Sequence, residues 1–416
     1  MRKNKSILFL SALDFKEKSI QVIRKTPEAY VEAGWDVNYI VIRDNSKYDN
    51  YYYEDEINLD GVNIIREYLP LTSLINRFGS NRIIRRILQK IAYFLAVLKL
   101  LIIGKNFLQN NKIDVIYGYE VHGVLTVNLL KLFRKTKNIK IISRFQGTFY
   151  SYYYYNKLYS KMIANFDHYV ALYLPSDLCI MTDDGTQGDK ALEILKSKNL
   201  KNYKFWPNGV DEQRLDSKKV IELKNKLNPD NKLVFLTVCR LENWKRVDRG
   251  LRAIAILKSE YNVKDFIYYI VGEGIEKDNL MQLSYELGIN DNVIFTGAIS
   301  NLKVKEYLNI ADFFLSMYDS SNVGNPLLEA IRSNKIIFTL NTGDTKRWIQ
   351  HKENGFIYDV DSNLYSNMAD DIFNVINNKQ CRNSILEGIK KTESDKLWTW
   401  NERLSAEIKE VEKLFD

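Results

Sequence analysis

Two hydrophobic patterns alternate along the chain and together predict an α/β protein. Short apolar, β-branched runs are typical of strands, and apolar residues at every third or fourth position are typical of helices. The predicted strands of the second half are Leu233–Val238, Asp265–Val271, Asn292–Phe295, Ala311–Met317 and Ile336–Thr339. Because strands that alternate with helices form parallel sheets, a doubly wound parallel sheet is expected here.

The first half shows the same alternation. Its predicted strands are Ser6–Leu10, Val37–Ile42, Asp114–Tyr117, Lys140–Ser143 and His168–Leu172. A chain of 416 residues is expected to form two domains, each with its own core. We place the domains at residues 1–205 and 206–395, followed by a terminal helix, 396–416, that crosses back to the first domain.

A basic and apolar stretch lies in the middle of the first half. Its apolar residues recur at helical spacing from Ile83 to Ile103, with Arg82, Arg85, Arg86, Lys90 and Lys99 between them. The uninterrupted apolar run Ile91–Leu98 is far shorter than the ~20 residues of a spanning helix. Two interpretations stay open: a helix in the headgroup layer of an anionic membrane, and a core helix with a basic polar face.

Charge is distributed unevenly, which bears on the partners. Between Tyr68 and Phe166, sixteen Lys and Arg face only Asp114 and Glu120, so this span carries +14 within a chain of net charge +8. Such asymmetry suits an anionic membrane surface or an anionic acceptor. Nucleic acid is not predicted, because the cations interleave with apolar residues rather than forming a platform for bases.

Cysteine usage and the first residues indicate the cytoplasm. Cys179, Cys239 and Cys381 are odd in number and far apart, so neither a disulfide framework nor a zinc site is indicated. The first apolar run is too short for a signal peptide. The pair Asp183–Asp184 precedes a glycine, as in ordinary turns, and we predict no metal site there.

Candidate chemistry follows the strand Leu233–Val238. Arg240 and Lys245 lie in the next loop, five positions apart, where open α/β sheets bind ligands. A planar guanidinium and a mobile ammonium together suit a diphosphate, although two loop cations also occur as a solvated pair.

A second segment, Asp319–Ile331, favours the diphosphate. Asn325 is the predicted N-cap and Pro326 the first residue of a helix whose amides face the ligand. Gly324 lets the backbone approach that ligand. Glu329, one turn inside, can accept hydrogen bonds from a diol such as ribose, or act only as a partner of the helix dipole.

Five short motifs carry a family resemblance. They are Trp206-Pro-Asn-Gly-Val-Asp211, Arg240-x4-Lys245, Val271-Gly-Glu-Gly274, Val293-Ile-Phe-Thr-Gly297 and Gly324-x-Pro-Leu-Leu-Glu-Ala330. On these motifs, residues 200–360 resemble the retaining glycosyltransferases of family 4. The resemblance implies the GT-B fold, in which two Rossmann-like domains face each other across a cleft.

The resemblance also implies an activity: transfer of a hexose-like sugar from a UDP- or GDP-linked donor to a hydroxyl group, with retention and without metal or other cofactor. The implied catalytic residues are Arg240, Lys245 and Glu329. The implied donor-binding residues are His122, Gly274, Gly297, Ser321, Asn322, Gly324, Asn325 and Leu327. The implied acceptor is a glycan or lipid-linked glycan of cell-surface polysaccharide or glycolipid assembly, which places the protein in the cytoplasm or on the inner face of the membrane.

Some assignments keep alternatives. Family members usually have a glutamate eight positions before Glu329, where this chain has Ser321, so Asp319 or Asn322 is a candidate for contact with the sugar. His122 is expected in a loop with Tyr119 and Glu120, facing the donor sugar or bonded to backbone. A nucleotide-sugar epimerase of the same architecture and a non-catalytic nucleotide-sugar-binding subunit remain the other functions.

Overall fold

The structure is a computed structural model that describes the chain except residues 1–4, 16–20, 45–56, 70–74, 76–80 and 133–137. The chain forms two compact units. Unit 1 comprises residues 1–183, 188–206 and 401–416, and unit 2 comprises residues 184–187 and 207–400.

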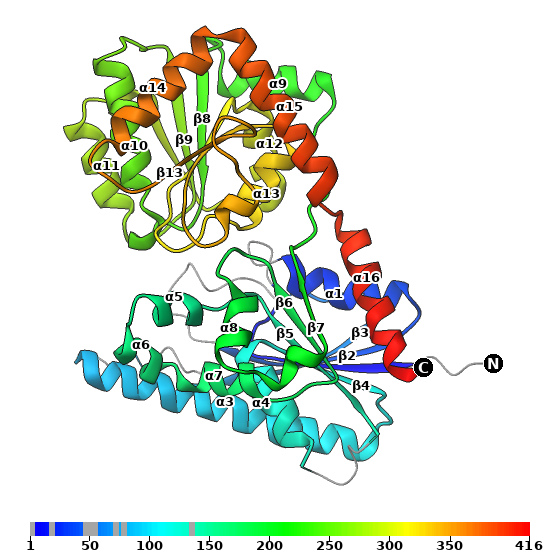
Figure 1. Ribbon diagram of the computed structural model, residues 1–416. Helices are drawn as coiled ribbons and strands as arrows, with labels where there is room; N and C mark the ends of the chain where they lie inside the picture. Colours follow the sequence, from blue (N-terminus) through cyan, green and yellow to red (C-terminus); the bar gives the residue numbers. More distant parts are fainter. Residues whose placement is uncertain (1–4, 16–20, 45–56, 70–74, 76–80, 133–137) are drawn as a thin grey trace. The chain divides into compact units, whose positions relative to one another are not determined.

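Unit 1 is built on a parallel sheet whose described strands have the order β3-β2-β1-β4-β5-β6-β7 (Figure 1). The strands are β1 (Ser6–Ser11), β2 (Asp36–Asp44), β3 (Val62–Leu69), β4 (Val115–Tyr119), β5 (Lys140–Phe145), β6 (Leu178–Thr182) and β7 (Tyr203–Trp206). The helices are α1 (Gln21–Glu32), α3 (Arg82–Asn110), α4 (Glu120–Leu130), α5 (Tyr150–Tyr155), α6 (Tyr159–Ala164), α7 (Phe166–Tyr173), α8 (Gly188–Ile194) and most of α16 (Trp400–Glu412).

Strands β1, β4 and β6 of unit 1 are buried along their whole length and largely apolar, as expected for a sheet covered on both faces. Leu8 and Leu10 point to one face, into a core that includes Leu100 of α3. Phe9 points to the other face, where its ring meets Tyr30 of α1 edge to face at 5.7 Å. Helices on both faces make the sheet doubly wound, as the hydrophobic pattern predicts.

Helix α16 belongs to unit 1 through a buried polar cluster. The carboxylate of Glu407 accepts hydrogen bonds from the hydroxyl of Tyr117 at 2.8 Å and from Arg403 at 3.0 Å. The Arg403 guanidinium also lies 4.7 Å from the ring centroid of Trp206. A buried ion pair that lost one partner would leave an uncompensated charge, so this cluster holds the helix firmly on the unit.

Unit 2 has a second parallel sheet, whose described strands have the order β10-β9-β8-β11-β12-β13. They are β8 (Leu233–Val238), β9 (Phe266–Val271), β10 (Val293–Gly297), β11 (Phe313–Ser316), β12 (Ile336–Leu340) and β13 (Phe356–Tyr358). The helices are α9 (Ser217–Leu227), α10 (Val247–Ser259), α11 (Lys277–Glu286), α12 (Asn301–Ile310), α13 (Asn325–Arg332), α14 (Leu364–Asn377) and α15 (Lys379–Lys396).

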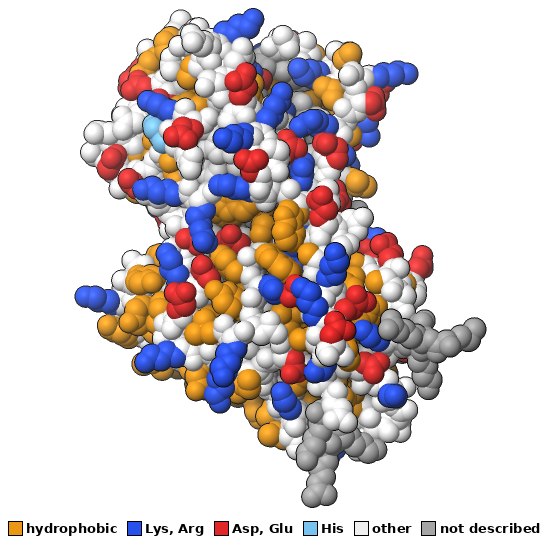
Figure 2. Space-filling view, turned by 45° about the vertical axis from the view of Figure 1, so that its right-hand side comes forward, with side chains coloured by type: hydrophobic (Ala, Val, Ile, Leu, Met, Phe, Trp, Pro, Cys, Tyr) orange, Lys and Arg blue, Asp and Glu red, His pale blue; other side chains and the backbone are white. Residues whose placement is uncertain are grey.

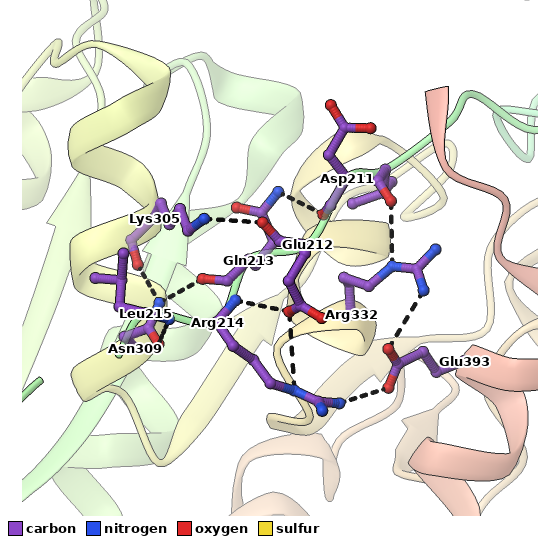
Figure 3. A network of polar contacts seen from close by, with 10 residues as sticks. Asp211, Glu212, Gln213, Arg214, Leu215, Lys305, Asn309, Arg332 and Glu393 are labelled. Atoms are coloured by element: carbon purple, nitrogen blue, oxygen red, sulfur yellow. Dashed lines mark hydrogen bonds and ion pairs between the residues drawn. The ribbon is translucent and has the colours of Figure 1, made fainter. Parts of the chain in front are cut away.

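The backbone at residues 211–215 is fixed to three helices of unit 2 (Figure 3). Asn309 of α12 donates to the carbonyl of Gln213 and accepts from the amide of Leu215. Glu393 of α15 forms ion pairs with Arg214 at 3.0 Å and with Arg332, in the last turn of α13, at 3.3 Å. The network anchors the carboxyl end of α13, and with it the direction in which its amino end points.

One predicted strand is wrong and three strands were not predicted. The predicted strand His168–Leu172 lies in helix α7, and the strand of this region is β6, which begins at Leu178. A short apolar run fits a strand and a buried helix equally well by its pattern, and only packing decides between them. The pattern also missed β3, β7 and β13.

Helix α3 is longer than its uninterrupted apolar run suggested. Within the described residues, Ile83–Asn110 is long and apolar enough to cross a membrane by length and composition, with a mean hydropathy of 1.9. The expectation that this segment is too short to span therefore does not hold. Of the most apolar 18-residue window of this helix, 28% is buried inside the structure.

Candidate functional site

The candidate site of unit 2 lies where the strand order of the sheet reverses. Strand β8 is flanked by β9 on one side and by β11 on the other. Loops after such strands diverge and leave a crevice at the carboxyl edge of the sheet, the usual ligand site of open α/β folds. The loops after β8 and β11 carry Arg240, Lys245 and the start of α13, so the sequence motifs flank this crevice.

The two loops are bonded to each other. The amide of Asp319 donates to the carbonyl of Trp244 at 3.0 Å, and the Tyr318 hydroxyl donates to the carbonyl of Val238 at 3.2 Å. Arg249 of α10 reaches across to Asp319 at 2.7 Å. These contacts hold the loop after β11 against the loop after β8, so the two motifs have a fixed spacing.

Lys245 is held between two aromatic rings. Its ammonium lies 3.9 Å from the ring centroid of Trp244 and 3.6 Å from that of Tyr318. Burial lowers the pKa of Lys245 to about 8, and repulsion from Arg240 lowers it further, against opposing effects of Cys239, Glu242 and Asp184. A poorly hydrated ammonium gains more from an anionic ligand than a hydrated one does.

Arg240 is the exposed partner of this lysine. Its guanidinium forms an ion pair of 2.6 Å with Glu242 while half of its side chain stays exposed. The charge of Arg240 lowers the pKa of Lys245. The two predicted cations are therefore close enough in the structure to interact. Glu242 also accepts a hydrogen bond from the indole of Trp244 at 2.6 Å, so one carboxylate orients both the arginine and the ring that covers the lysine.

The glycines at 272 and 274 let one loop cross another. A Cβ at Gly272 would lie 1.8 Å from the carbonyl oxygen of Cys239, and one at Gly274 would lie 2.3 Å from that of Leu241. The amide of Gly272 donates to Gly297 at 3.1 Å. Gly274 and Gly297 thus support the backbone around Arg240, and whether they also contact a nucleotide base stays a prediction.

The start of α13 differs by one residue from the prediction. Gly324, with extended φ and ψ of −144° and 175°, is the N-cap, and Asn325 is the first helical residue. The side chain of Asn325 accepts a hydrogen bond from Asn208 at 3.0 Å instead of capping the helix. A Cβ at Gly324 would meet only Pro326, at 3.8 Å, so the fold does not require glycine there. The missing side chain instead keeps the helix start accessible to a ligand.

Leu327 and Glu329 lie in the first turns of α13. The Leu327 side chain is buried in the core, so only its backbone amide is suited to contact a ligand. Burial raises the pKa of Glu329 to about 7. This carboxyl group therefore titrates near neutrality, which is typical of functional sites.

The residues on either side of the missing glutamate have structural partners. Asn322 is buried, with its side-chain oxygen accepting from Ser316 and its amide nitrogen donating to Thr342 at 2.7 Å. Asp319 forms ion pairs with Arg246 and Arg249. Both side chains thus hold the loop, which leaves neither in a good position to replace the glutamate.

Ser321 holds the short segment 184–187, which belongs to unit 2. Its hydroxyl donates to the carbonyl of Asp184 at 2.7 Å. A Cβ at Gly185 would lie 2.3 Å from that hydroxyl oxygen, so glycine at 185 is what lets the Ser321 hydroxyl reach this segment. Gln187 donates to Asp344 at 3.0 Å and fixes the other end of the segment.

His122 lies in unit 1. It occupies the first turn of α4 and not a loop, because Glu120, with a φ of 56°, turns the chain directly from β4 into the helix. Its ring lies 3.9 Å from that of Tyr93. Burial lowers the pKa of His122 to about 4, so the imidazole is neutral at physiological pH.

Sequence reasoning missed the aromatic walls around Lys245 and the segment 184–187. Trp244 precedes Lys245 in the sequence. An aromatic residue next to a predicted phosphate-binding lysine could have indicated a ring contact with its ammonium. The position of Asp184 had no such signal, because it depends on long-range packing.

Comparison with known proteins agrees with this architecture. Residues 219–392, which lie within unit 2, match the family model of the glycosyl transferases group 1. Among solved structures, Anabaena HepE in complex with UDP is similar with a TM-score of 0.68 at 14% identity, over 99% of this chain and 100% of that one. At that identity the likeness shows a shared fold, that of the two-domain GT-B glycosyltransferases.

Two curated relatives are similar over part of the chain. Alpha-monoglucosyldiacylglycerol synthase of Streptococcus pneumoniae is 31% identical over 33% of this chain and 31% of its own length. N-acetyl-alpha-D-glucosaminyl L-malate synthase of Bacillus anthracis is 27% identical over 37% of this chain and 39% of its own length. The chain thus aligns with about a third of the length of these relatives.

Proposed function

We propose that the protein is a glycosyltransferase that moves a sugar from a nucleoside-diphosphate sugar to a hydroxyl acceptor, with retention and without a divalent metal ion. The observation that carries this is the pair of loops after β8 and β11, which are bonded to each other at the strand-order reversal of unit 2 and carry Lys245, Arg240 and the start of α13. Helix starts and desolvated cations at such a position suit a diphosphate.

The chemistry follows from where charge develops. As the bond between the sugar and the diphosphate breaks, negative charge grows on the leaving phosphate, and a prepositioned ammonium, guanidinium and helix start stabilise it. Glu329, once ionised, accepts hydrogen bonds from the ribose hydroxyls. The departing phosphate itself can take the acceptor proton, so this mechanism needs no separate general base.

The comparisons support the class of donor. The UDP complex of the structural neighbour and the sugar-transferring names of the curated relatives favour a UDP-sugar, with a GDP-sugar as the other option. The donor is identified by a thermal-shift panel of nucleoside diphosphates and their sugars. A ligand at 100 times its dissociation constant adds about 2.7 kcal/mol of stability. Failure of every nucleotide to shift the transition would contradict the proposal.

Ser321 supports one second candidate, a non-catalytic subunit that binds a nucleotide sugar. The family glutamate is absent at this position, and the neighbouring Asp319 and Asn322 are engaged in the loop. Incubation with the preferred nucleotide sugar separates the two functions. Release of nucleoside diphosphate selects the enzyme, and tight binding without release, in the presence of acceptor extracts, selects the subunit.

A further inference from the structure

Helix α3 of unit 1 has apolar residues on two opposite sides. One side packs on the sheet, where Ala96, Leu100 and Leu108 are buried in a common core with Leu8 and Leu10. The other side is open, with exposed fractions of 68% for Ile83, 54% for Ile87, 50% for Ile91, 65% for Phe94, 39% for Leu98 and 52% for Ile102. Their spacing of three or four residues places them on one face of the helix.

Helices α6 and α7 extend this apolar face. Lys90 of α3 forms an ion pair of 2.7 Å with Asp167 of α7, and the rings of Tyr93 and His168 stack at 6.5 Å, so α7 lies beside α3. The exposed apolar residues that α6 and α7 add are Ile163, Phe166 and Val170. We call the exposed apolar residues of the three helices the α3 surface. Contiguous exposed apolar area of this kind marks an interaction site.

Cations accompany the α3 surface. Arg85 and Arg86 are exposed near the amino end of α3, and Lys157 and Lys161 are exposed at α5 and α6. From Tyr68 to Phe166 the sequence has sixteen Lys and Arg against two acids. Figure 2 shows hydrophobic side chains with Lys and Arg among them on the surface of unit 1.

We propose that the α3 surface docks unit 1 on an anionic lipid bilayer, with α3 lying parallel to the membrane plane. Apolar side chains on one helix face would enter the headgroup boundary, and the flanking cations would meet anionic lipids. The exposed cations Arg85, Arg86, Lys157 and Lys161 favour an anionic surface over a second copy of the same chain, because two such surfaces repel each other.

A membrane-spanning arrangement of α3 conflicts with its packing. The helix is long and apolar enough to cross a bilayer, but its other side is part of the core of unit 1. Spanning would remove Ala96, Leu100 and Leu108 from the sheet and expose the residues they cover. An in-plane helix keeps this core and buries the outer face as well.

This docking goes beyond the proposed sugar transfer and does not depend on it. If both hold, a lipid or a lipid-linked glycan is the acceptor class that meets unit 1 at the membrane. The docking is tested by vesicle flotation, whereas donor binding in unit 2 is tested in solution, so either can fail alone.

The test compares flotation with phosphatidylcholine vesicles and with vesicles that also contain phosphatidylglycerol. Wild type is expected to float only with the anionic vesicles. Ile87→Asp/Phe94→Asp is expected to lower partitioning roughly 100-fold, since burial of each side chain is worth roughly tenfold or more. Both positions are exposed, so the fold should tolerate the change, which an unchanged melting temperature verifies.

A matched control places the same charges elsewhere. Ile221 and Tyr285 of unit 2 are 60% and 70% exposed, and Ile221→Asp/Tyr285→Asp is expected to float as wild type does. Arg85→Glu/Arg86→Glu should weaken partitioning about fivefold for each cation removed. Equal flotation of wild type and Ile87→Asp/Phe94→Asp overturns the proposal. The proposal is also overturned if the wild type is a dimer in solution and Ile87→Asp/Phe94→Asp makes it a monomer, because the surface would then pair two copies of the chain.

Discussion

Replacing Lys245 by methionine should leave the stability of the ligand-free protein almost unchanged and strongly weaken nucleotide binding. Burial lowers the pKa of this ammonium from its usual 10.5 to about 8, a difference that corresponds to about 3 kcal/mol. Loss of the contacts with Trp244 and Tyr318 costs about 2 kcal/mol each, because the ammonium is desolvated. The two effects nearly cancel, so the free energy of unfolding should change by no more than about 1 kcal/mol in a denaturant titration at pH 7.

Nucleotide affinity of Lys245→Met should fall. A hydrogen bond to a charged group contributes about 1.5–3 kcal/mol, so Lys245→Met should weaken UDP binding roughly 100-fold in calorimetry. The pH dependence has a defined sign. A diphosphate favours the ammonium form, so the contribution of Lys245 to the affinity should be constant below about pH 8 and be lost as the pH rises through that value.

Lys335 provides the matched control. Burial also lowers its pKa to about 8, but it precedes β12 at the opposite edge of the sheet and donates to the carbonyl of Ala311 at 2.9 Å. Lys335→Met should therefore remove a comparably buried charge and leave UDP binding unchanged. Wild-type affinity for UDP in Lys245→Met would refute the assignment of this ammonium to the diphosphate.

Three further variants test other parts of the site. Gly324→Ala should keep the melting temperature of wild type, since the added Cβ has space. It should weaken UDP binding roughly tenfold, because the methyl group enters the diphosphate position. An unchanged affinity in calorimetry would contradict this. Ser321→Glu should lose about 1–3 kcal/mol in denaturant titration without faster transfer, because a larger side chain replaces a buried serine that is bonded to Asp184. A stable, faster variant would restore the role of the family glutamate. The diphosphate of a UDP-sugar does not titrate near neutrality, so affinity for a UDP-sugar should rise with pH up to about 7 as Glu329 ionises. Glu329→Gln should remove this rise. The same pH profile in wild type and Glu329→Gln would exclude the ribose assignment.

The parallel sheets followed from the sequence because each strand of a doubly wound sheet is locally apolar. Leu233–Val238 was predicted with its exact bounds, since a buried central strand is bracketed by polar loops. The run His168–Leu172 failed because its helical burial depends on packing against the rest of unit 1. The short β13 was missed because three residues carry too little pattern.

The candidate site was predictable only in part. Arg240, Lys245 and the start of α13 follow predicted strands, so their meeting at one edge could be expected from topology. The binding of Asp184 by Ser321 joins residues 137 positions apart and could not be expected. The same holds for Asp319, whose ion pair with Arg249 is a consequence of tertiary packing.

The most direct measurement is a structure of the protein with UDP bound. The account predicts a diphosphate in the crevice of unit 2, with the ammonium of Lys245 and the backbone amide of Leu327 within hydrogen-bonding distance of its oxygens. A diphosphate bound away from both groups would contradict it.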